Sequence, residues 1–256
     1  MSSKASSTIG FERRFNHALQ LEDEVAFVAE AATVATPKPP NMARLVELNR
    51  GPLVGAPREV NELPVAPAGA TVLDVRASPD FLAGHEHGAL NVPVSGSSFA
   101  TKAGFVLDAD GSVVVQAATT HEAARAIRGL QAVGFLELEG YVLGEGPERI
   151  EPVSLDELDA LLAEGAELID VRERDERDSG YIAGSRNIPY RLLPLCGAEV
   201  PTDRPVVTIC ESGARAGIAA SILAAQGVDA RPVIAGGLTA WAARGGAMVE
   251  FRRCGS

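Results

Sequence analysis

The sequence is poor in cysteine and in positive charge. Its 256 residues include three cysteines, Cys196, Cys210 and Cys254, and such an odd, sparse set does not form a disulfide framework. Lysine and arginine number 23 against 34 aspartates and glutamates, for a formal net charge of −11. This balance disfavours nucleic acid and anionic membrane surfaces as partners, because phosphate binding needs a positive field.

Long apolar runs are also missing. No stretch of the sequence could span a bilayer, and its start lacks the charged-then-apolar pattern of a secretory signal. A hydrophobic share of 46% and a charged share of 22% suit a soluble enzyme or enzyme fragment. We therefore expect a cytoplasmic protein, in a reducing compartment that suits a reactive thiol.

Recognisable metal-ligand patterns are absent. The array His-x-His-x-Asp-His does not occur, and His85-Glu86-His87, which places two histidines at alternate positions, is not followed by Asp-His. His17 and His121 are isolated. We predict no metal and no cofactor.

One of the three cysteines stands where a nucleophile would. The apolar run 205–209 ends at Cys210, and a short loop follows before an alanine-rich stretch typical of a helix. This order predicts a buried strand, a tight loop and a helix whose first amides point back at the sulfur. A helix N-terminus and a nest of backbone N–H groups stabilise an anion. We therefore predict that Cys210 is a thiolate nucleophile.

Three blocks of residues carry a resemblance to the rhodanese (sulfurtransferase) family. The segment from Cys210 to Arg215 resembles the family's Cys-x-x-Gly-x-Arg loop, which is shorter than the Cys-x5-Arg cradle of phosphate-monoester hydrolases. Residues 168–189 are similar to its Asp-Val-Arg block and to the following block that ends in Asn-Ile-Pro, with Tyr181 where histidine is usual. Residues 236–241 resemble the closing Gly-Gly…Trp block, and we expect Trp241 in the core.

The resemblance implies a sulfurtransferase that works by a persulfide. The Cys210 thiolate would take the outer sulfur of thiosulfate, a polysulfide or glutathione persulfide, and a thiol, cyanide or sulfite acceptor would then remove it. Arg215 would clamp an anionic donor. The loop amides from position 211 to 215 would hold the persulfide, so the implied substrate-binding residues are Glu211, Ser212, Gly213 and Ala214.

Two further charged residues of this region invite more than one interpretation. Glu211 at the loop rim would repel dianionic thiosulfate by about 1 kcal/mol, which makes low-molecular-weight persulfides the better donors. Arg172 could add positive potential at the substrate site. We favour instead a structural ion pair with Asp170, since the sequence has a second copy of this pair at Asp74 and Arg76.

The chain contains an internal repeat. Residues 73–76 match residues 169–172, and residues 91–93 match residues 187–189, at one constant offset of 96. We name residues 53–148 the first repeat and residues 149–256 the second repeat, and we predict that each is a rhodanese-like domain. With three residues dropped, Ala117 aligns with Cys210, so the first repeat is expected to be catalytically inactive.

Each repeat alternates short β-branched runs with helical segments, which predicts an α/β fold with mostly parallel sheets flanked by helices. In the second repeat we expect a capping box at residues 154–157 that opens a helix ended by Gly165, a strand at 167–171, and a helix at 215–226. The reactive residues then fall at the carboxyl end of a central strand.

Residues 1–52 belong to neither repeat. We expect a helix at residues 21–32, a proline-rich hinge at 36–40, and Asn41 as the cap of a short helix that ends at Leu48. Residues 7–16 and 39–52 look like the tail of a metallo-β-lactamase-fold domain of the persulfide dioxygenase-like kind. The resemblance implies such a domain as a partner or as a missing part of a larger fusion.

Two other function classes stay open. A phosphatase-like or arsenate-reductase-like enzyme could use the same nucleophile, although the short loop and the lack of an aspartate in the loop argue against it. Alternatively, both repeats could form a binding or regulatory module that partners a persulfide dioxygenase. Cys196 could resolve a persulfide on Cys210 as a disulfide, but we favour no role for it, and we expect Cys254 to be a bystander.

Overall fold

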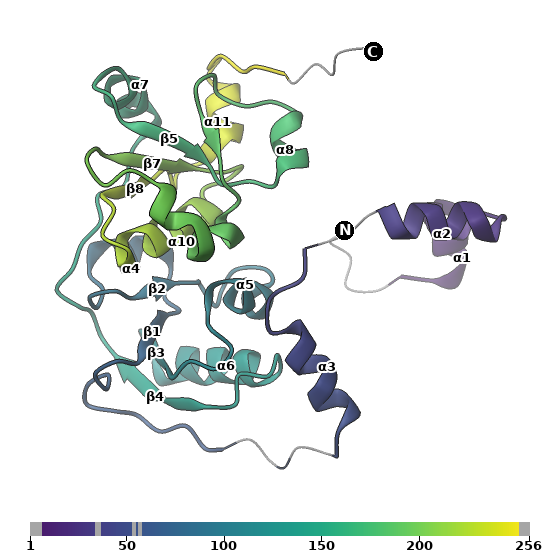
Figure 1. The fold of residues 1–256 in the computed structure, drawn as a ribbon, viewed down its shortest axis with the longest axis horizontal. Coiled ribbons are helices and arrows are strands. Elements are labelled where there is room, and N and C mark those ends of the chain that lie inside the picture. Colours follow the sequence, from purple (N-terminus) through teal and green to yellow (C-terminus); the bar gives the residue numbers. More distant parts are fainter. Residues whose placement is uncertain (1–6, 34–36, 53–54, 56–57, 251–256) are drawn as a thin grey trace. The chain divides into compact units, whose positions relative to one another are not determined.

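Two four-stranded parallel β-sheets form the framework of the chain (Figure 1). The structure is a computed structural model that describes residues 7–33, 37–52, 55 and 58–250. The strand order is β2-β1-β3-β4 in the first sheet and β6-β5-β7-β8 in the second. The strands are β1 (Thr71–Asp74), β2 (Leu90–Asn91), β3 (Val113–Ala117), β4 (Leu138–Leu143), β5 (Glu167–Asp170), β6 (Arg186–Asn187), β7 (Val206–Ile209) and β8 (Ala230–Pro232).

Helices connect the strands and flank both sheets, so the predicted α/β class is confirmed. In the first repeat they are α4 (Ser78–Ala83), α5 (Phe99–Val106) and α6 (Thr120–Gln131). In the second repeat they are α7 (Leu155–Ala163), α8 (Arg174–Asp178), α9 (Leu193–Cys196), α10 (Ala214–Ala225) and α11 (Gly237–Ala243), with the 3-10 helices η2 (Tyr190–Leu192) and η3 (Gly197–Glu199).

The elements predicted around the thiol are present. Ser154 and Glu157 form the expected capping box at the start of α7. The helix ends shortly before Gly165, which has a φ of +98°. The predicted strand at 167–171 is β5, and the predicted helix at 215–226 is α10. Trp241 is 5% exposed and packs in the core, as expected.

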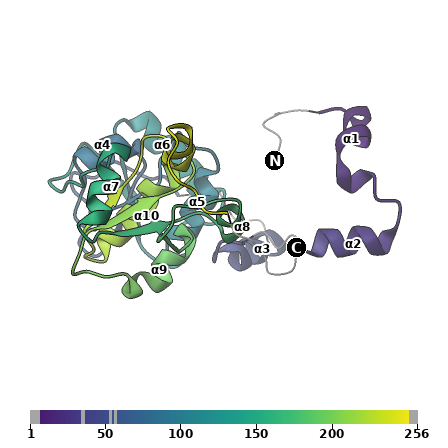
Figure 2. The same cartoon turned by 90° about the horizontal axis from the view of Figure 1, so that it is seen from above.

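Helix α10 is buried on all sides. Its residues 216–223 are all buried, and it contacts β7 and β8 of its own sheet as well as β2 of the first repeat (Figure 1). Seen from above, α10 lies among the other helices of the two repeats (Figure 2). A helix that is hydrophobic all round suits such a position. Gly217 faces Ser78 of α4, where an added Cβ would lie 2.9 Å from the Ser78 hydroxyl oxygen. The two repeats therefore share one core rather than being joined by a loose linker.

The amino-terminal part divides differently from its sequence pattern. By its contacts the chain forms two compact units, residues 1–38 and 39–256. The first unit holds α1 (Ile9–Phe15), the 3-10 helix η1 (His17–Leu19) and α2 (Glu24–Thr33), which is the expected helix.

Helix α3 (Met42–Arg50) belongs to the second unit. Asn41 is its N-cap residue as predicted, but the Asn41 side chain makes no capping hydrogen bond and donates instead to the Val133 carbonyl oxygen over 2.7 Å. Arg44 likewise donates to the Ala109 carbonyl oxygen over 2.7 Å. These bonds fasten α3 to the first repeat. None of the helices in the described ranges is long and apolar enough to cross a bilayer.

Candidate active site at the carboxyl end of β7

Cys210 directly follows β7, a central strand of the second sheet. Strand β7 pairs with β5 on one side and with β8 on the other, and all its residues are buried. The chain then passes through residues 211–213 into α10. Open parallel sheets bind their ligands at this edge. The predicted order of strand, loop and helix is confirmed, and Cys210 is 1% exposed.

The loop turns a main-chain amide toward the sulfur. Gly213 adopts a φ of +101°, and its N–H donates a hydrogen bond to Cys210 Sγ over 3.2 Å. A side chain at this position has no room, because a Cβ would lie 2.2 Å from the Ile234 carbonyl oxygen. The sulfur therefore lies at the N-terminus of α10, where amides and the helix dipole stabilise an anion.

The amino-terminal end of α11 supports the other side of the loop. Leu238 N–H donates to the Cys210 carbonyl oxygen over 2.9 Å, and Thr239 N–H donates to the Glu211 carbonyl oxygen over 3.1 Å. This close approach requires Gly237, since a Cβ there would lie 2.2 Å from the Cys210 carbonyl oxygen. The glycines of the closing block thus hold the loop that carries the thiol.

Arg215 is held by a carboxylate that the sequence pattern did not single out. Its Nη1 and Nη2 donate to Glu176 Oε2 and Oε1 of α8 over 2.5 and 2.6 Å. The Glu176 carboxylate raises the pKa of Arg215, and the guanidinium in turn lowers the pKa of Glu176. Cys210 raises the pKa of Arg215 further. The guanidinium therefore interacts electrostatically with Cys210 but already carries a counter-charge.

Glu211 is likewise paired. Arg172 Nη1 donates to its Oε2 over 3.2 Å, and Thr239 Oγ1 donates to its Oε1 over 2.7 Å. The Glu211 side chain is 51% exposed, so it lies at the rim as expected. Because a neighbouring cation offsets its charge, its repulsion of an anionic donor is weaker than the sequence alone suggests.

Arg172 makes the structural ion pair that we favoured. Its Nε and Nη2 donate to the Asp170 carboxylate, and Nη2 also donates to the Gly180 carbonyl oxygen over 2.6 Å. The first repeat repeats this arrangement with Asp74, Arg76 and the Gly84 carbonyl oxygen. Arg172 is 4% exposed, and its donors tie the end of β5 to the turn after α8.

The other loop residues differ in exposure. Ser212 and Ala214 are exposed, whereas Gly213 is buried. Tyr181, which replaces the family's usual histidine, stacks against a cation, since the Arg177 guanidinium lies 3.6 Å from the centre of its ring. Tyr181 thus has a structural contact of its own.

The first repeat has no equivalent cradle. Strand β1 pairs Asp74 with Gln116, and β5 pairs Asp170 with Ile209, so the residue that follows each partner is Ala117 in one repeat and Cys210 in the other. The next amide, Ala118 N–H, donates to Glu122 Oε2 over 2.9 Å. A carboxylate of the protein itself thus occupies the place where an anion would bind.

Two residues near the thiol escaped the sequence reasoning because they come from distant segments. Tyr190 of η2 is 7% exposed, and burial raises the pKa of its hydroxyl to about 12. Lys102 of α5 belongs to the first repeat, and the charges that act on its ammonium are those of Arg215 and Cys210. No motif spacing could have revealed either residue. For Glu176, the partner of Arg215, the sequence does offer a signal, because Glu176 follows Glu173 at the spacing of a capping box.

Other candidate residues lie away from this loop. The Cys196 thiol donates to the Leu192 carbonyl oxygen over 3.1 Å, and burial raises its pKa. Cys254 lies outside the described residues. In the part of the chain that the structure describes, no group of three or more metal-ligating side chains comes together.

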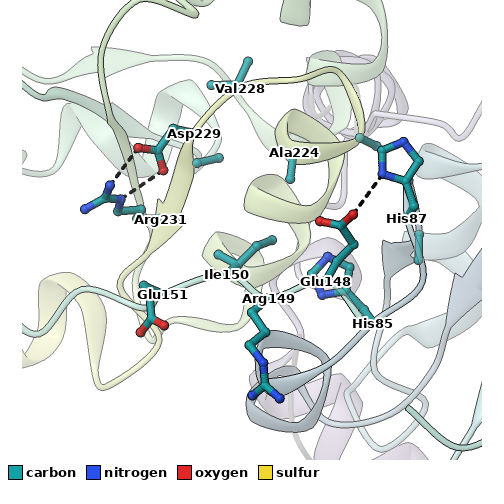
Figure 3. A pocket seen from close by; sticks show the side chains of 14 residues that line it. His85, His87, Glu148, Arg149, Ile150, Glu151, Ala224, Val228, Asp229 and Arg231 are labelled. Carbon is teal, nitrogen blue, oxygen red and sulfur yellow. Dashed lines mark hydrogen bonds and ion pairs between the residues drawn. The ribbon is translucent and has the colours of Figure 1, made fainter. Parts of the chain in front are cut away.

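A pocket of about 370 Å³ lies between the two repeats, away from the Cys210 loop (Figure 3). It is lined by Asp229 and Arg231 at the amino end of β8, opposite the edge that bears Cys210. Two pairs form among its polar side chains, Asp229 with Arg231 over 2.7 Å and His87 with Glu148 over 3.3 Å (Figure 3). His85 beside them bonds the Phe81 carbonyl oxygen. This pocket is a polar seam between the repeats.

Comparisons with known proteins agree with this geometry. Residues 154–244 match the family model of the rhodanese-like domain. The chain is 38% identical over 78 residues to a sulfurtransferase of Allochromatium vinosum, covering 30% of this chain and 73% of that protein. It is 30% identical over 94 residues to the thiosulfate sulfurtransferase GlpE of Stutzerimonas stutzeri, covering 37% of this chain and 84% of that protein.

Other matches cover less of the relative. The uncharacterised protein YqhL of Bacillus subtilis is 41% identical over 76 residues, and the chain spans 60% of its length. Among solved structures, a metallo-β-lactamase from Staphylococcus aureus aligns over 54% of this chain and 40% of that one, with 25% identity and a TM-score of 0.46. The family model and the two matches that extend over more than two thirds of a relative agree, and the chain therefore belongs to the rhodanese-like family.

Proposed function

We propose that the second repeat is a sulfurtransferase that carries sulfane sulfur as a persulfide on Cys210. The observation that carries this proposal is the hydrogen bond from Gly213 N–H to Cys210 Sγ at the N-terminus of α10. It provides a place for a charged sulfur at the reactive edge of the sheet. Two relatives that bear the name sulfurtransferase support the reaction type.

The reaction has two halves. The Cys210 thiolate attacks the outer sulfur of thiosulfate, the bond between the two sulfur atoms of the donor breaks, and its electron pair leaves on sulfite. A thiolate or cyanide acceptor then attacks the outer sulfur of the Cys210 persulfide, and the Cys210 thiolate leaves. Each half conserves charge and needs no external oxidant or reductant, and the enzyme alternates between two states.

Loop residues would share the work of holding the terminal sulfur. We assign the amides of positions 211 to 215 to hold it, and Gly213 supplies the turn that directs its own amide to the sulfur. We assign to Arg215 the role of stabilising the persulfide from the position that Glu176 enforces. Because Arg172 offsets the charge of Glu211, thiosulfate and low-molecular-weight persulfides are both suitable donors.

The first repeat completes the architecture of two tandem rhodanese-like domains, which we place at residues 53–148 and 149–256. Its sheet has the same strand order and the same buried Asp-Arg pair, which supports the common origin of the repeats. With Ala117 at the position of the thiol, it forms no persulfide.

The segment before the repeats suits a partner domain. Its unit, residues 1–38, exposes large apolar side chains, among them Ile9, Val25 and Phe15 at 78%, 74% and 62%. Together with the resemblance of residues 7–16 and 39–52, this supports a metallo-β-lactamase-fold domain, within the same protein or as a separate chain, as the cover of these side chains. Sizing of the native polypeptide by proteomic mass spectrometry distinguishes the two arrangements.

Intact-mass measurement tests the sulfurtransferase proposal. After incubation with thiosulfate or glutathione persulfide, the chain is expected to gain the mass of one sulfur atom, and cyanide is expected to remove it. Cys210→Ala should gain none, while Cys196→Ala should behave as the wild type. If the wild-type chain gains no sulfur from any donor, the alternative of a non-catalytic module that partners a persulfide dioxygenase replaces this proposal.

A further inference from the structure

Helix α5 of the first repeat packs against η2 of the second repeat. The Phe105 ring lies edge-on against Tyr190 of η2, with ring centres 6.3 Å apart and planes at 81°. Burial raises the pKa of the Tyr190 hydroxyl, and the charge of Arg215 opposes this rise. Lys102 precedes Phe105 by three residues, so both side chains lie on one face of α5. Lys102 therefore lies on the face of α5 that packs against the second repeat.

The charges around Lys102 are those of the catalytic region. Burial lowers the pKa of its ammonium, the Arg215 guanidinium lowers it further, and Cys210 raises it. The side chain is half-buried, so its electrostatic interactions are less screened than those of a surface lysine. The ammonium of Lys102 therefore interacts electrostatically with Arg215 and Cys210 of the other repeat.

Lys102 differs from the arginines of this region in having no counter-ion. Arg215 pairs with Glu176, Arg191 pairs with Glu173, and Arg172 pairs with both Asp170 and Glu211. Within the described part of the chain, Lys102 forms no ion pair with a carboxylate. Compared with the paired arginines named here, Lys102 therefore offers an incoming anion a positive charge that is not shared with a carboxylate of the described residues.

We propose that Lys102 of the first repeat binds the anionic sulfur donor for Cys210 of the second repeat, so that the two repeats share one substrate site. This inference rests on the proposed sulfurtransferase function and assigns its substrate class as anionic sulfane-sulfur donors such as thiosulfate. The ammonium holds the sulfonate end of thiosulfate and stabilises the sulfite that leaves when the Cys210 thiolate takes the outer sulfur. The inactive repeat thereby has a function in the reaction.

Three substitutions of different charge test this assignment. Lys102→Arg keeps the charge, Lys102→Met removes it at similar length, and Lys102→Glu reverses it, while Lys38→Met removes a lysine elsewhere as the matched control. We expect kcat/KM for thiosulfate near the wild-type value in Lys102→Arg and Lys38→Met, about tenfold lower in Lys102→Met, and lower again in Lys102→Glu. The loss should be carried mainly by KM and should shrink as ionic strength rises.

An equal loss in all three Lys102 variants, or a Lys102→Met value within about twofold of the wild type, overturns the inference. A second readout is independent of sulfur transfer: the rate at which Cys210 is alkylated by anionic iodoacetate relative to neutral iodoacetamide, followed on the peptide that contains Cys210. Lys102→Met should lower this ratio, and an unchanged ratio counts against the cation. If the ratio falls but no donor yields a persulfide, the proposed function fails while the anion site stands.

Discussion

The pair of Arg215 and Glu176 determines how much positive charge reaches the Cys210 sulfur. Two hydrogen bonds fix the guanidinium in one orientation, and the carboxylate cancels most of its charge. The two side chains are 22% and 36% exposed, so solvent screens the pair only in part. Glu176 thus weakens the attraction of Arg215 for an anionic donor but fixes the position of its guanidinium.

Glu176→Gln is expected to separate these two effects. The amide oxygen still accepts from Arg215, but the counter-charge is gone, so KM for thiosulfate should fall by a few-fold while kcat changes little. Glu176→Ala removes the acceptor as well and should lower kcat about tenfold, because the guanidinium loses its orientation. Steady-state kinetics on both variants measures this split. Equal kinetic parameters in the two variants would refute a positioning role.

The same pair predicts a pH dependence of stability. Glu176 has its pKa lowered below the ordinary 4.5 by Arg215, so the stabilisation is present above that value and is lost as pH falls through the lowered pKa. At pH 7 we expect Glu176→Gln to be less stable than the wild type by about 0.5–1 kcal/mol, and the difference should vanish once the Glu176 carboxyl of the wild type is protonated. Urea unfolding across this range measures the difference.

At the scale of secondary structure, the loop between β7 and α10 depends on a glycine that no other residue can replace. Gly213 combines a positive φ with a neighbouring carbonyl oxygen that leaves no room for a Cβ. Gly227, after α10, also has a positive φ of +85°, but nothing lies within 4 Å of the Cβ position. Substitutions at these two glycines therefore distinguish the effect of backbone strain alone from the effect of distorting the loop that holds the Cys210 sulfur.

Gly213→Ala is therefore expected to abolish persulfide formation and to lower stability by more than about 1–3 kcal/mol, since strain and overlap add. Gly227→Ala should cost about 1 kcal/mol and leave sulfur transfer intact. Thermal unfolding and intact-mass measurement on both variants provide the comparison. Normal persulfide formation in Gly213→Ala would mean that the loop amides do not hold the sulfur.

The end of strand β5 depends on a buried ion pair. Asp170 and Arg172 are 1% and 4% exposed, and Arg172 links the strand to the Gly180 carbonyl oxygen and to Glu211. A buried arginine that loses its carboxylate keeps its desolvation cost without the compensating charge. Through these contacts, Arg172 connects the end of β5 to Glu211 of the loop that follows Cys210.

Asp170→Asn should therefore destabilise the chain by about 3 kcal/mol, whereas Asp203→Asn, in a solvent-exposed pair with Arg204, should change it by less than about 1 kcal/mol. Urea unfolding at neutral pH measures both values. A similar small change in the two variants would show that the buried pair has no structural importance.

At the scale of the whole molecule, the sequence predicts the features that depend on local pattern and on the internal repeat. The offset of 96 anticipates two sheets of the same strand order, and the capping box at Ser154 anticipates α7. The register of β1 against β3 and of β5 against β7 reproduces the correspondence of Ala117 with Cys210. Such features depend on neighbours in sequence, on the strand period and on the repeat itself.

Contacts between distant segments could not be predicted. Glu176 bonds Arg215 across 39 residues of sequence, and Lys102 interacts electrostatically with Arg215 and Cys210 from the other repeat. Asn41 has the composition of a helix cap, yet its side chain bonds Val133, because burial against the first repeat offers a partner that sequence spacing does not reveal. The same holds for helix α10. Its lack of a polar face predicts that it is buried, but not that β2 of the first repeat packs against it.

Cys210 carries the sulfur because of the amides around it at the N-terminus of α10, and not merely because it is a buried thiol. Ala117→Cys places a second thiol at the matching position of the first repeat, where Ala117 is 0% exposed beside the 1% of Cys210, in a loop whose amide is occupied by Glu122. Peptide mass spectrometry after incubation with thiosulfate locates the sulfur in this variant. We predict persulfide on Cys210 alone; a similar extent of persulfide on the peptide that contains position 117, or none on either peptide, would contradict the account.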